Sequence, residues 1–124
     1  MSNEKLKDLF DDVYESIEII IKRTENVVSA EEFVTNDAGL EKLDAVSMRL
    51  QIIGETLKKI ESETEGFLNN YKDIEWNKII KMREIISHHY SDIDAEIIFD
   101  IIKNHIPPLK HTITNIISDL NKEN

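Results

Sequence analysis

The sequence predicts an all-α protein, an up-down helical bundle of four or five main helices. Three observations support this fold class. Apolar residues recur at alternating steps of three and four along several long segments, which is the spacing of one face of a helix. Three glycines and two prolines in 124 residues leave little room for hairpins or long loops. A chain of this length forms one domain, so residues 1–124 are expected to fold as a single unit.

Each expected helix has its own apolar stripe. The first segment is periodic over about six turns and suits antiparallel packing against another long helix. Gly54 interrupts the stripe of the second long segment, where close approach of a neighbouring helix is the structural explanation. The stripes are Leu6, Phe10, Val13, Ile17, Ile20, Thr24 and Val27; Leu40, Leu43, Val46, Leu50, Ile53, Leu57 and Ile60; Trp76, Ile79, Ile80, Met82 and Ile86; Ile97, Ile98, Ile101 and Ile102; Leu109, Ile113, Ile116, Ile117 and Leu120.

Polar residues that favour helix N-termini precede the first helices. Ser2 or Asn3 is expected to cap the first. Ser29 and Glu32 match a capping box and predict a short helix that ends near residues 35–36. Asp37 is expected to cap the long helix that follows.

The second half of the chain carries similar boundary signals. Residues 61–73 lose the period and are expected to form the main loop, after which Asp73 or its neighbour starts the helix with Trp76. Ser91 to Asp94 forms a second capping box. Pro107 and Pro108 are expected to stop that helix and open the last one.

Composition restricts the classes of function. The net charge of −10 argues against a generic nucleic-acid binder, so any RNA role needs a local basic site. The absence of cysteine excludes disulfides and thiolate metal sites and fits a reducing cytoplasm. The first residues lack the apolar core of a signal peptide, and no apolar run is long enough to span a membrane. We therefore expect a cytoplasmic protein without membrane contact.

Candidate chemistry is concentrated between Trp76 and Tyr90. Arg83 offers a fixed fork of donors that fits a phosphate, and His88 can move protons near neutral pH. Together they suffice for RNA cleavage without a metal, with the imidazole taking the 2′-OH proton and the guanidinium stabilising charge on phosphorus. The structural alternative is an exposed salt-bridge arginine, a half-buried histidine and an ordinary core aromatic at Tyr90.

Helix geometry leaves two ways to combine Arg83 and His88. Five residues at roughly 100° each place them about 140° apart on a continuous helix. Either the helix ends near Ser87 and turns His88 back, or a second subunit contributes part of the working pair. The auxiliary candidates for RNA binding are Lys78, Lys81, Glu84, Ser87 and His89, and a two-fold dimer would gather the lysines and histidines into one basic cleft.

The pattern Arg83-x4-His88-x-Tyr90 resembles the signature of HepT-like toxins in the HEPN ribonuclease superfamily. The resemblance covers roughly residues 5–120 and includes Ile53-Gly54-Glu55, Trp76, Asp92-Ile-Asp94 and the segment around Pro107. It implies the all-α HEPN fold and a homodimer with a shared cleft. It also implies metal-independent cleavage of RNA that leaves a 2′,3′-cyclic phosphate.

The resemblance further implies a partner, a minimal nucleotidyltransferase (MNT) antitoxin that transfers AMP from ATP to Tyr90. Bulky, anionic AMP beside Arg83 would occupy the phosphate site and repel RNA. No cofactor is expected.

Glu84 departs from the family, which often has a small polar residue after the arginine. A carboxylate there could weaken RNA binding or orient His88. It also keeps an alternative open, a non-catalytic helper subunit that presents substrate to a separate nucleotidyltransferase. His105 and His111 are six residues apart, which is not a helical ligand spacing, so no metal site is expected there.

Overall fold

The computed structural model describes residues 1–88 and 94–122, with the side chains of Ile85, Ser87 and His88 left undescribed. Within that part of the chain the structure is helical and has no strand, so the predicted all-α fold is confirmed. The order is α1 (Asn3–Thr24), α2 (Glu32–Thr35), α3 (Asp37–Glu63), a 3₁₀ turn (Phe67–Asn70), α4 (Trp76–His88), α5 (Ala95–Asp100), a π-helical turn (Ile101–His105) and α6 (Ile106–Lys122).

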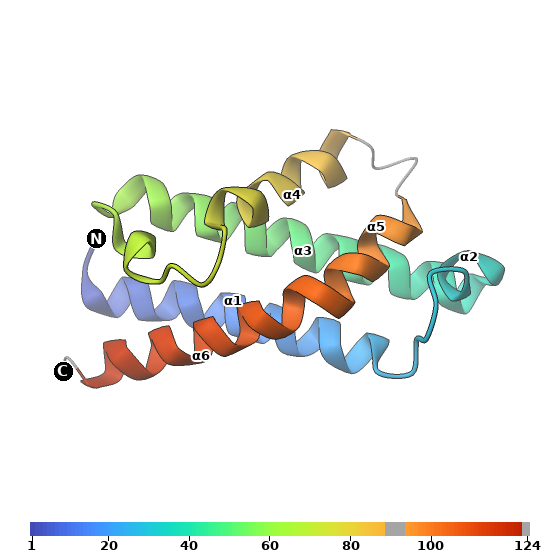
Figure 1. The fold of residues 1–124 in the computed structure, drawn as a ribbon, viewed down its shortest axis with the longest axis horizontal. Helices are drawn as coiled ribbons and strands as arrows, with labels where there is room; N and C mark the ends of the chain where they lie inside the picture. The colour runs from blue at the N-terminus through green and yellow to red at the C-terminus, as the bar shows by residue number, and fades with distance from the viewer. Residues whose placement is uncertain (89–93, 123–124) are drawn as a thin grey trace.

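The long helices alternate in direction, as an up-down bundle requires. Figure 1 shows α1 and α3 running antiparallel, with α4 above them and α6 returning toward the end where both termini lie. α3 packs against α1 on one side and α4 on the other, and α6 packs against α1. Because α3 is central, it carries α4 and therefore the candidate site.

The predicted stripes form one continuous core. The side chains at its centre are fully buried, among them Phe10, Ile17, Leu50, Leu57 and Ile113. Three stripe positions differ: Leu40 and Ile97 are 42% and 43% exposed, and Ile117 is half-buried. Leu40 and Ile97 lie in the first turn of their helices, where fewer neighbours cover a side chain.

The caps of the first helices follow the predicted chemistry with shifts in position. Ser2 caps α1 by accepting a hydrogen bond from the Lys5 amide. The Glu32 carboxylate accepts from the Ser29 amide, as in a capping box, but α2 begins only at Glu32. Asn36 caps α3, so the prediction of Asp37 is wrong by one residue. Asn36 has the extended backbone of a cap residue and its side chain accepts from the Gly39 amide, whereas Asp37 is already helical.

The boundaries of the later helices differ more from the predicted ones. α3 continues to Glu63, so the loop is shorter than residues 61–73, and α4 begins at Trp76 rather than near Asp73. Asp94 is itself the cap of α5, accepting from the amides of Glu96 and Ile97. Ser91, the other half of the predicted box, lies outside the described residues.

Pro107 does not stop the preceding helix. α5, the π-helical turn and α6 follow one another without a break, and Figure 1 shows them as one long rod. Proline has no amide to donate and crowds the preceding turn. The wider turn at Ile101–His105 directly precedes Pro107 and accommodates it, as π-helical turns do inside α-helices. In the described part of the chain, no helix is both long and apolar enough to cross a bilayer.

Candidate functional site

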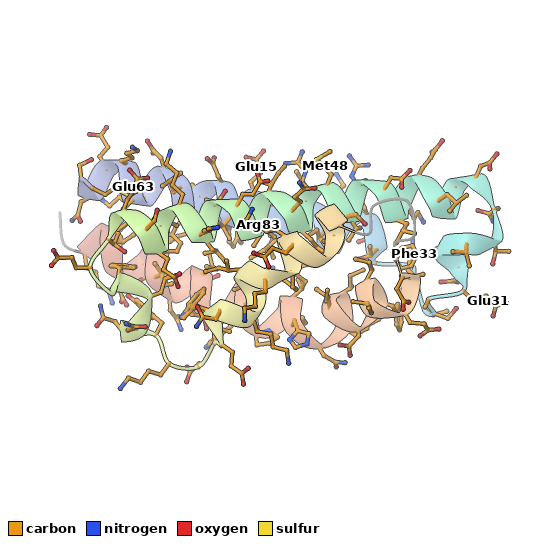
Figure 2. All side chains as sticks on the ribbon, turned by 90° about the horizontal axis from the view of Figure 1, so that it is seen from above. Glu15, Glu31, Phe33, Met48, Glu63 and Arg83 are labelled. Atoms are coloured by element: carbon orange, nitrogen blue, oxygen red, sulfur yellow. The ribbon has the colours of Figure 1, made fainter. Side chains whose placement is uncertain are left out.

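Arg83 lies on α4 at its contact with α3. The apolar side of α4, formed by Trp76, Ile79, Ile80 and Met82, is buried in the core and fixes the orientation of the helix. The Arg83 side chain is 24% exposed, so its guanidinium leaves the core only in part. Figure 2 shows it at the junction of α3 and α4.

Gly54 sets how closely α3 approaches Arg83. A Cβ atom at position 54 would lie 2.9 Å from the Arg83 Cβ, 3.3 Å from the Ile80 carbonyl oxygen and 3.4 Å from the backbone nitrogen of Arg83. The missing side chain therefore lets the backbone of α4 rest directly on α3. The predicted close approach at Gly54 is confirmed, and its partner is Arg83.

The local electrostatics leave Arg83 with unused donors. Its Nη2 lies 3.9 Å from Glu84 Oε1, a long contact with a neighbour whose side chain is 54% exposed. Its Nε is buried and has no hydrogen-bond partner among the described residues. An arginine placed to satisfy the fold would normally bond such a donor, since a buried unpaired group costs about 1–3 kcal/mol. Arg83 is thus held in place by packing, and the described side chains leave its Nε unbonded.

The other candidates fall on different faces of α4 or outside the described part. α4 includes Ser87 and ends at His88, so the backbone of His88 is helical, while its side chain lies outside the described part; both geometric alternatives stay predictions. The backbone positions of Arg83 and His88 are therefore about 140° apart around one helix axis. Lys78 and Lys81 are exposed. Position 81, seven residues before His88, shares the face of His88 rather than that of Arg83.

His89 and Tyr90 lie outside the described residues, so their predicted roles stay predictions. Glu55, next to Gly54, is exposed and accepts a weak bond from Gln51 at 3.4 Å. No three histidine or carboxylate side chains group into a metal site in the segments 1–88 and 94–122. His105 instead lies 3.6 Å from Asp100.

The buried Nε of Arg83 is the feature that sequence reasoning missed, because a donor count needs coordinates. Ser47 is a second case, with a fully buried hydroxyl that has no partner in the described segments. It lies on α3 two turns before Gly54 and so shares the face toward α4. A serine in a leucine and isoleucine stripe was the only signal in the sequence.

Comparison with known protein families shows which family the chain belongs to. The profile of the family described as Ribonuclease HepT-like matches residues 13–116, a span that includes Gly54, Arg83 and His88. The chain belongs to the ribonuclease HepT-like family. The resemblance seen in the sequence is thereby confirmed, and the expectation of a ribonuclease is confirmed at the level of the family.

Several relatives of this HepT-like chain align with most of its length. "Putative RNase MJ0127" of Methanocaldococcus jannaschii is 32% identical over 99% of this chain and 96% of its own. "Probable ribonuclease HepT" of Thermococcus cleftensis is 31% identical over 84% of this chain and 88% of its own. "Putative RNase TTE0752" of Caldanaerobacter subterraneus is 30% identical over 85% and 88%. No solved structure matches the chain.

Proposed function

We propose that this HepT-like protein is a metal-independent endoribonuclease whose working pair is Arg83 and His88, in a cleft shared by two copies of the chain. The observation that carries the proposal is Arg83 itself, packed against Gly54 yet with a buried Nε that no group in the described part of the chain satisfies. A phosphate oxygen is the acceptor that a guanidinium fork fits best. Family membership and relatives named as ribonucleases support RNA as the source of that phosphate.

The reaction needs two proton transfers and one displacement at phosphorus. His88 takes the proton of the 2′-OH, and the 2′-oxygen attacks the adjacent phosphorus. Arg83 stabilises the charge that develops on the phosphoryl oxygens. The bond from phosphorus to the 5′-oxygen breaks, and that oxygen takes a proton from water, so the products are a 2′,3′-cyclic phosphate and a 5′-hydroxyl.

The helical geometry supports a homodimer. The backbone positions of Arg83 and His88 are about 140° apart on α4, so the two residues start from different sides of the helix. A two-fold axis beside α4 would let Arg83 of one copy work with His88 of the other. The exposed lysines Lys78 and Lys81 would then add positive charge to the cleft of an acidic protein.

We further propose that the nuclease is the toxin of a toxin–antitoxin pair and acts in the cytoplasm. Its partner would be an MNT-type nucleotidyltransferase antitoxin that AMPylates Tyr90. Tyr90 is seven residues from Arg83, and an AMP group near the guanidinium would place a competing phosphate there. The resemblance of the Arg83-x4-His88-x-Tyr90 pattern supports this assignment.

The test is cleavage of a fluorescent single-stranded RNA in excess EDTA. Wild type should cleave and leave a 2′,3′-cyclic phosphate, while Arg83→Ala and His88→Ala should lose activity by about 100-fold or more, the usual range for such groups. Arg83→Lys keeps the charge without the fork and should also be impaired. His111→Ala, an exposed histidine on α6, is the matched control and should cleave normally. Cleavage that persists in either alanine variant contradicts the assignment.

One observation favours a second candidate function, a non-catalytic helper subunit of a minimal nucleotidyltransferase. Glu84 places a carboxylate 3.9 Å from Arg83 in a protein of net charge −10, which opposes RNA binding. ATP-dependent nucleotidyl transfer that appears only in a mixture with the partner, with no RNA cleavage by this protein alone, would establish the helper role.

A further inference from the structure

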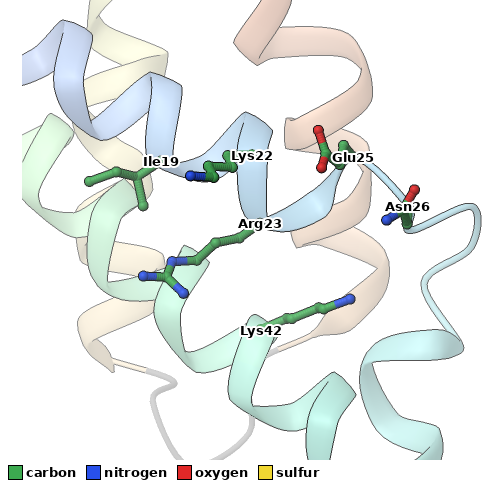
Figure 3. Close-up of a pocket in the computed structure, with 6 residues that line it drawn as sticks. All are labelled: Ile19, Lys22, Arg23, Glu25, Asn26 and Lys42. Atoms are coloured by element: carbon green, nitrogen blue, oxygen red, sulfur yellow. The ribbon is translucent and has the colours of Figure 1, made fainter.

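Three cations gather in one hollow between α1 and α3, away from Arg83. Lys22 and Arg23 come from the last turn of α1, and Lys42 comes from the second turn of α3. Figure 3 shows them around the same opening, which has a volume of about 510 Å³. The remaining lining residues are Ile19, Glu25 and Asn26.

Interaction with a helix dipole explains only two of these three cations. Cations in the last turn of a helix interact favourably with its dipole, and that accounts for Lys22 and Arg23. Lys42 gains nothing of this kind, because it lies in the N-terminal half of α3, where the dipole does not favour a cation. It is also half-buried. A helix-dipole role therefore leaves Lys42 unexplained.

The charge balance makes the cluster more unusual. The chain has 25 acidic and 15 basic residues, so a lysine or arginine has many carboxylates available. Lys110 and Lys5 do form ion pairs, with Glu18 and Glu63. Across the described residues, none of the three cations in the hollow forms one. The lining of this hollow thus has three cations and one acid, Glu25, a net positive charge that an anion would neutralise, although Figure 3 shows Arg23 and Lys42 extending in different directions.

The lining also indicates the chemistry of that anion. Ile19 is the one aliphatic side chain around the hollow, and no aromatic ring lines it. A nucleobase is usually held by stacking on an aromatic ring, and the described lining of this hollow has none. An arginine fork beside two lysines suits phosphate oxygens.

We propose that Lys22, Arg23 and Lys42 form a phosphate-binding subsite for the RNA chain, separate from the cleavage site. This inference rests on the proposed function, since it takes the substrate to be RNA. Lys42 precedes Gly54, the contact of Arg83, by twelve residues, which is about 18 Å along α3 at 1.5 Å per residue. The two positions are also about 120° apart around α3, so at roughly 3.4 Å per nucleotide of a stacked strand the path spans more than about five nucleotides. An RNA bound at both places would cross α3, and its affinity would come partly from backbone charge far from the cut.

The experiment measures binding of a 2′-O-methyl RNA 12-mer, which lacks the 2′-OH needed for cleavage, by fluorescence anisotropy between 50 and 200 mM salt. The variant is Lys22→Gln, Arg23→Gln and Lys42→Gln together. Each phosphate contact on a single strand contributes about 0.7 to the slope of log affinity against log salt, so three contacts contribute about 2. Over this fourfold range of salt, wild type should lose affinity about 20-fold more than the variant does. At 50 mM salt the variant should bind at least tenfold more weakly.

The matched control removes three cations elsewhere, with Lys58→Gln, Lys59→Gln and Lys122→Gln. Both triple variants change the net charge from −10 to −13, since −10 − 3 = −13. The control should keep most of the wild-type affinity and slope, because its residues do not line the hollow. Equal affinity and slope in wild type and the Lys22, Arg23, Lys42 variant would overturn the proposal. So would loss of binding to poly-glutamate with RNA binding intact, which would assign the hollow to an acidic protein partner.

Inorganic pyrophosphate provides a second arm, measured by titration calorimetry. Binding of pyrophosphate to wild type that disappears in the variant, without any change in RNA affinity, would identify a site for a small anion and overturn the RNA assignment. The binding assay requires no cleavage. A wild type that binds but does not cut would therefore refute the nuclease proposal while the subsite proposal stands.

Discussion

Gly54→Ala tests whether α3 holds Arg83 in position through close backbone contact. The new Cβ would meet the Arg83 Cβ at 2.9 Å, about 0.5 Å inside the shortest comfortable separation of roughly 3.4–3.5 Å between carbons. The obstructing atoms are the Arg83 Cβ and backbone atoms of α4, so no side-chain rotation relieves the contact. α4 must move, and Arg83 moves with it.

Two free-energy terms oppose each other in this variant. Replacing glycine by alanine inside a helix stabilises it by about 1 kcal/mol. Overpacking a tight contact typically costs 1–3 kcal/mol. The net expectation is a loss between about 0 and 2 kcal/mol, so the protein should still fold. Cleavage should fall by tenfold or more, since displacements of about 1 Å at a catalytic group cost up to about 100-fold.

The assay combines urea unfolding followed by circular dichroism with RNA cleavage in EDTA. Glu55→Ala is the control, because it changes the adjacent, exposed position of the same helix. It should leave both cleavage and stability close to wild type. A Gly54→Ala protein that is about 1 kcal/mol more stable and cleaves normally would refute the reasoning, because helix propensity alone would then explain it.

Three further predictions concern a cap, an ion pair and the proposed off-switch. Asn36→Ala should lower the free energy of unfolding by about 1 kcal/mol in urea titrations, while Asp37→Ala should cost less, because Asn36 is the cap. Lys110 Nζ lies 2.7 Å from Glu18 Oε1, and this hydrogen bond lowers the pKa of Glu18 and raises the pKa of Lys110 from their ordinary values of 4.5 and 10.5. A depressed carboxylate pKa stabilises the fold above about pH 4.5 and a raised lysine pKa stabilises it below about pH 10.5. The stability difference between wild type and Glu18→Gln should therefore be largest between these values and shrink as pH falls through the lowered pKa; a difference independent of pH would contradict this. Incubation with the proposed MNT-type antitoxin and ATP should add AMP to wild type but not to Tyr90→Phe by intact mass, and equal addition to both would exclude Tyr90 as the acceptor.

Much of the fold could be predicted from the sequence because packing dominates it. The stripes from Leu6 to Thr24 and from Leu43 to Ile60 follow the helical period, and every stripe residue within these spans is buried. Boundaries were less predictable, because neighbouring polar residues compete for the same cap. Asn36 and Asp37 are both good cap residues, and only the backbone conformation distinguishes them.

The π-helical turn before Pro107 shows a second limit. A proline pair is a strong stop signal in sequence, yet a helix continues when a wider turn accommodates the missing amide and the crowded ring. That adjustment depends on the packing of Ile101, Ile102 and Ile106 in the core, which holds the rod straight.

The candidate site was predictable as a set of residues and less so as a geometry. Spacing identified Arg83 and the close approach at Gly54, but the identity of their contact and the unsatisfied Nε needed coordinates. The hollow with Lys22 and Lys42 had no signal at all, because its cations come from two helices and look like ordinary surface lysines along the sequence.

The most direct test of the central claim is complementation between two inactive proteins, Arg83→Ala and His88→Ala, co-expressed with different tags so that mixed dimers form. If each site takes Arg83 from one chain and His88 from the other, a mixed dimer has one intact site and one site that lacks both groups. With half the dimers mixed and half their sites intact, the account predicts about a quarter of wild-type RNA cleavage in EDTA. A mixture of the two proteins that remains as inactive as each alone would contradict the shared cleft.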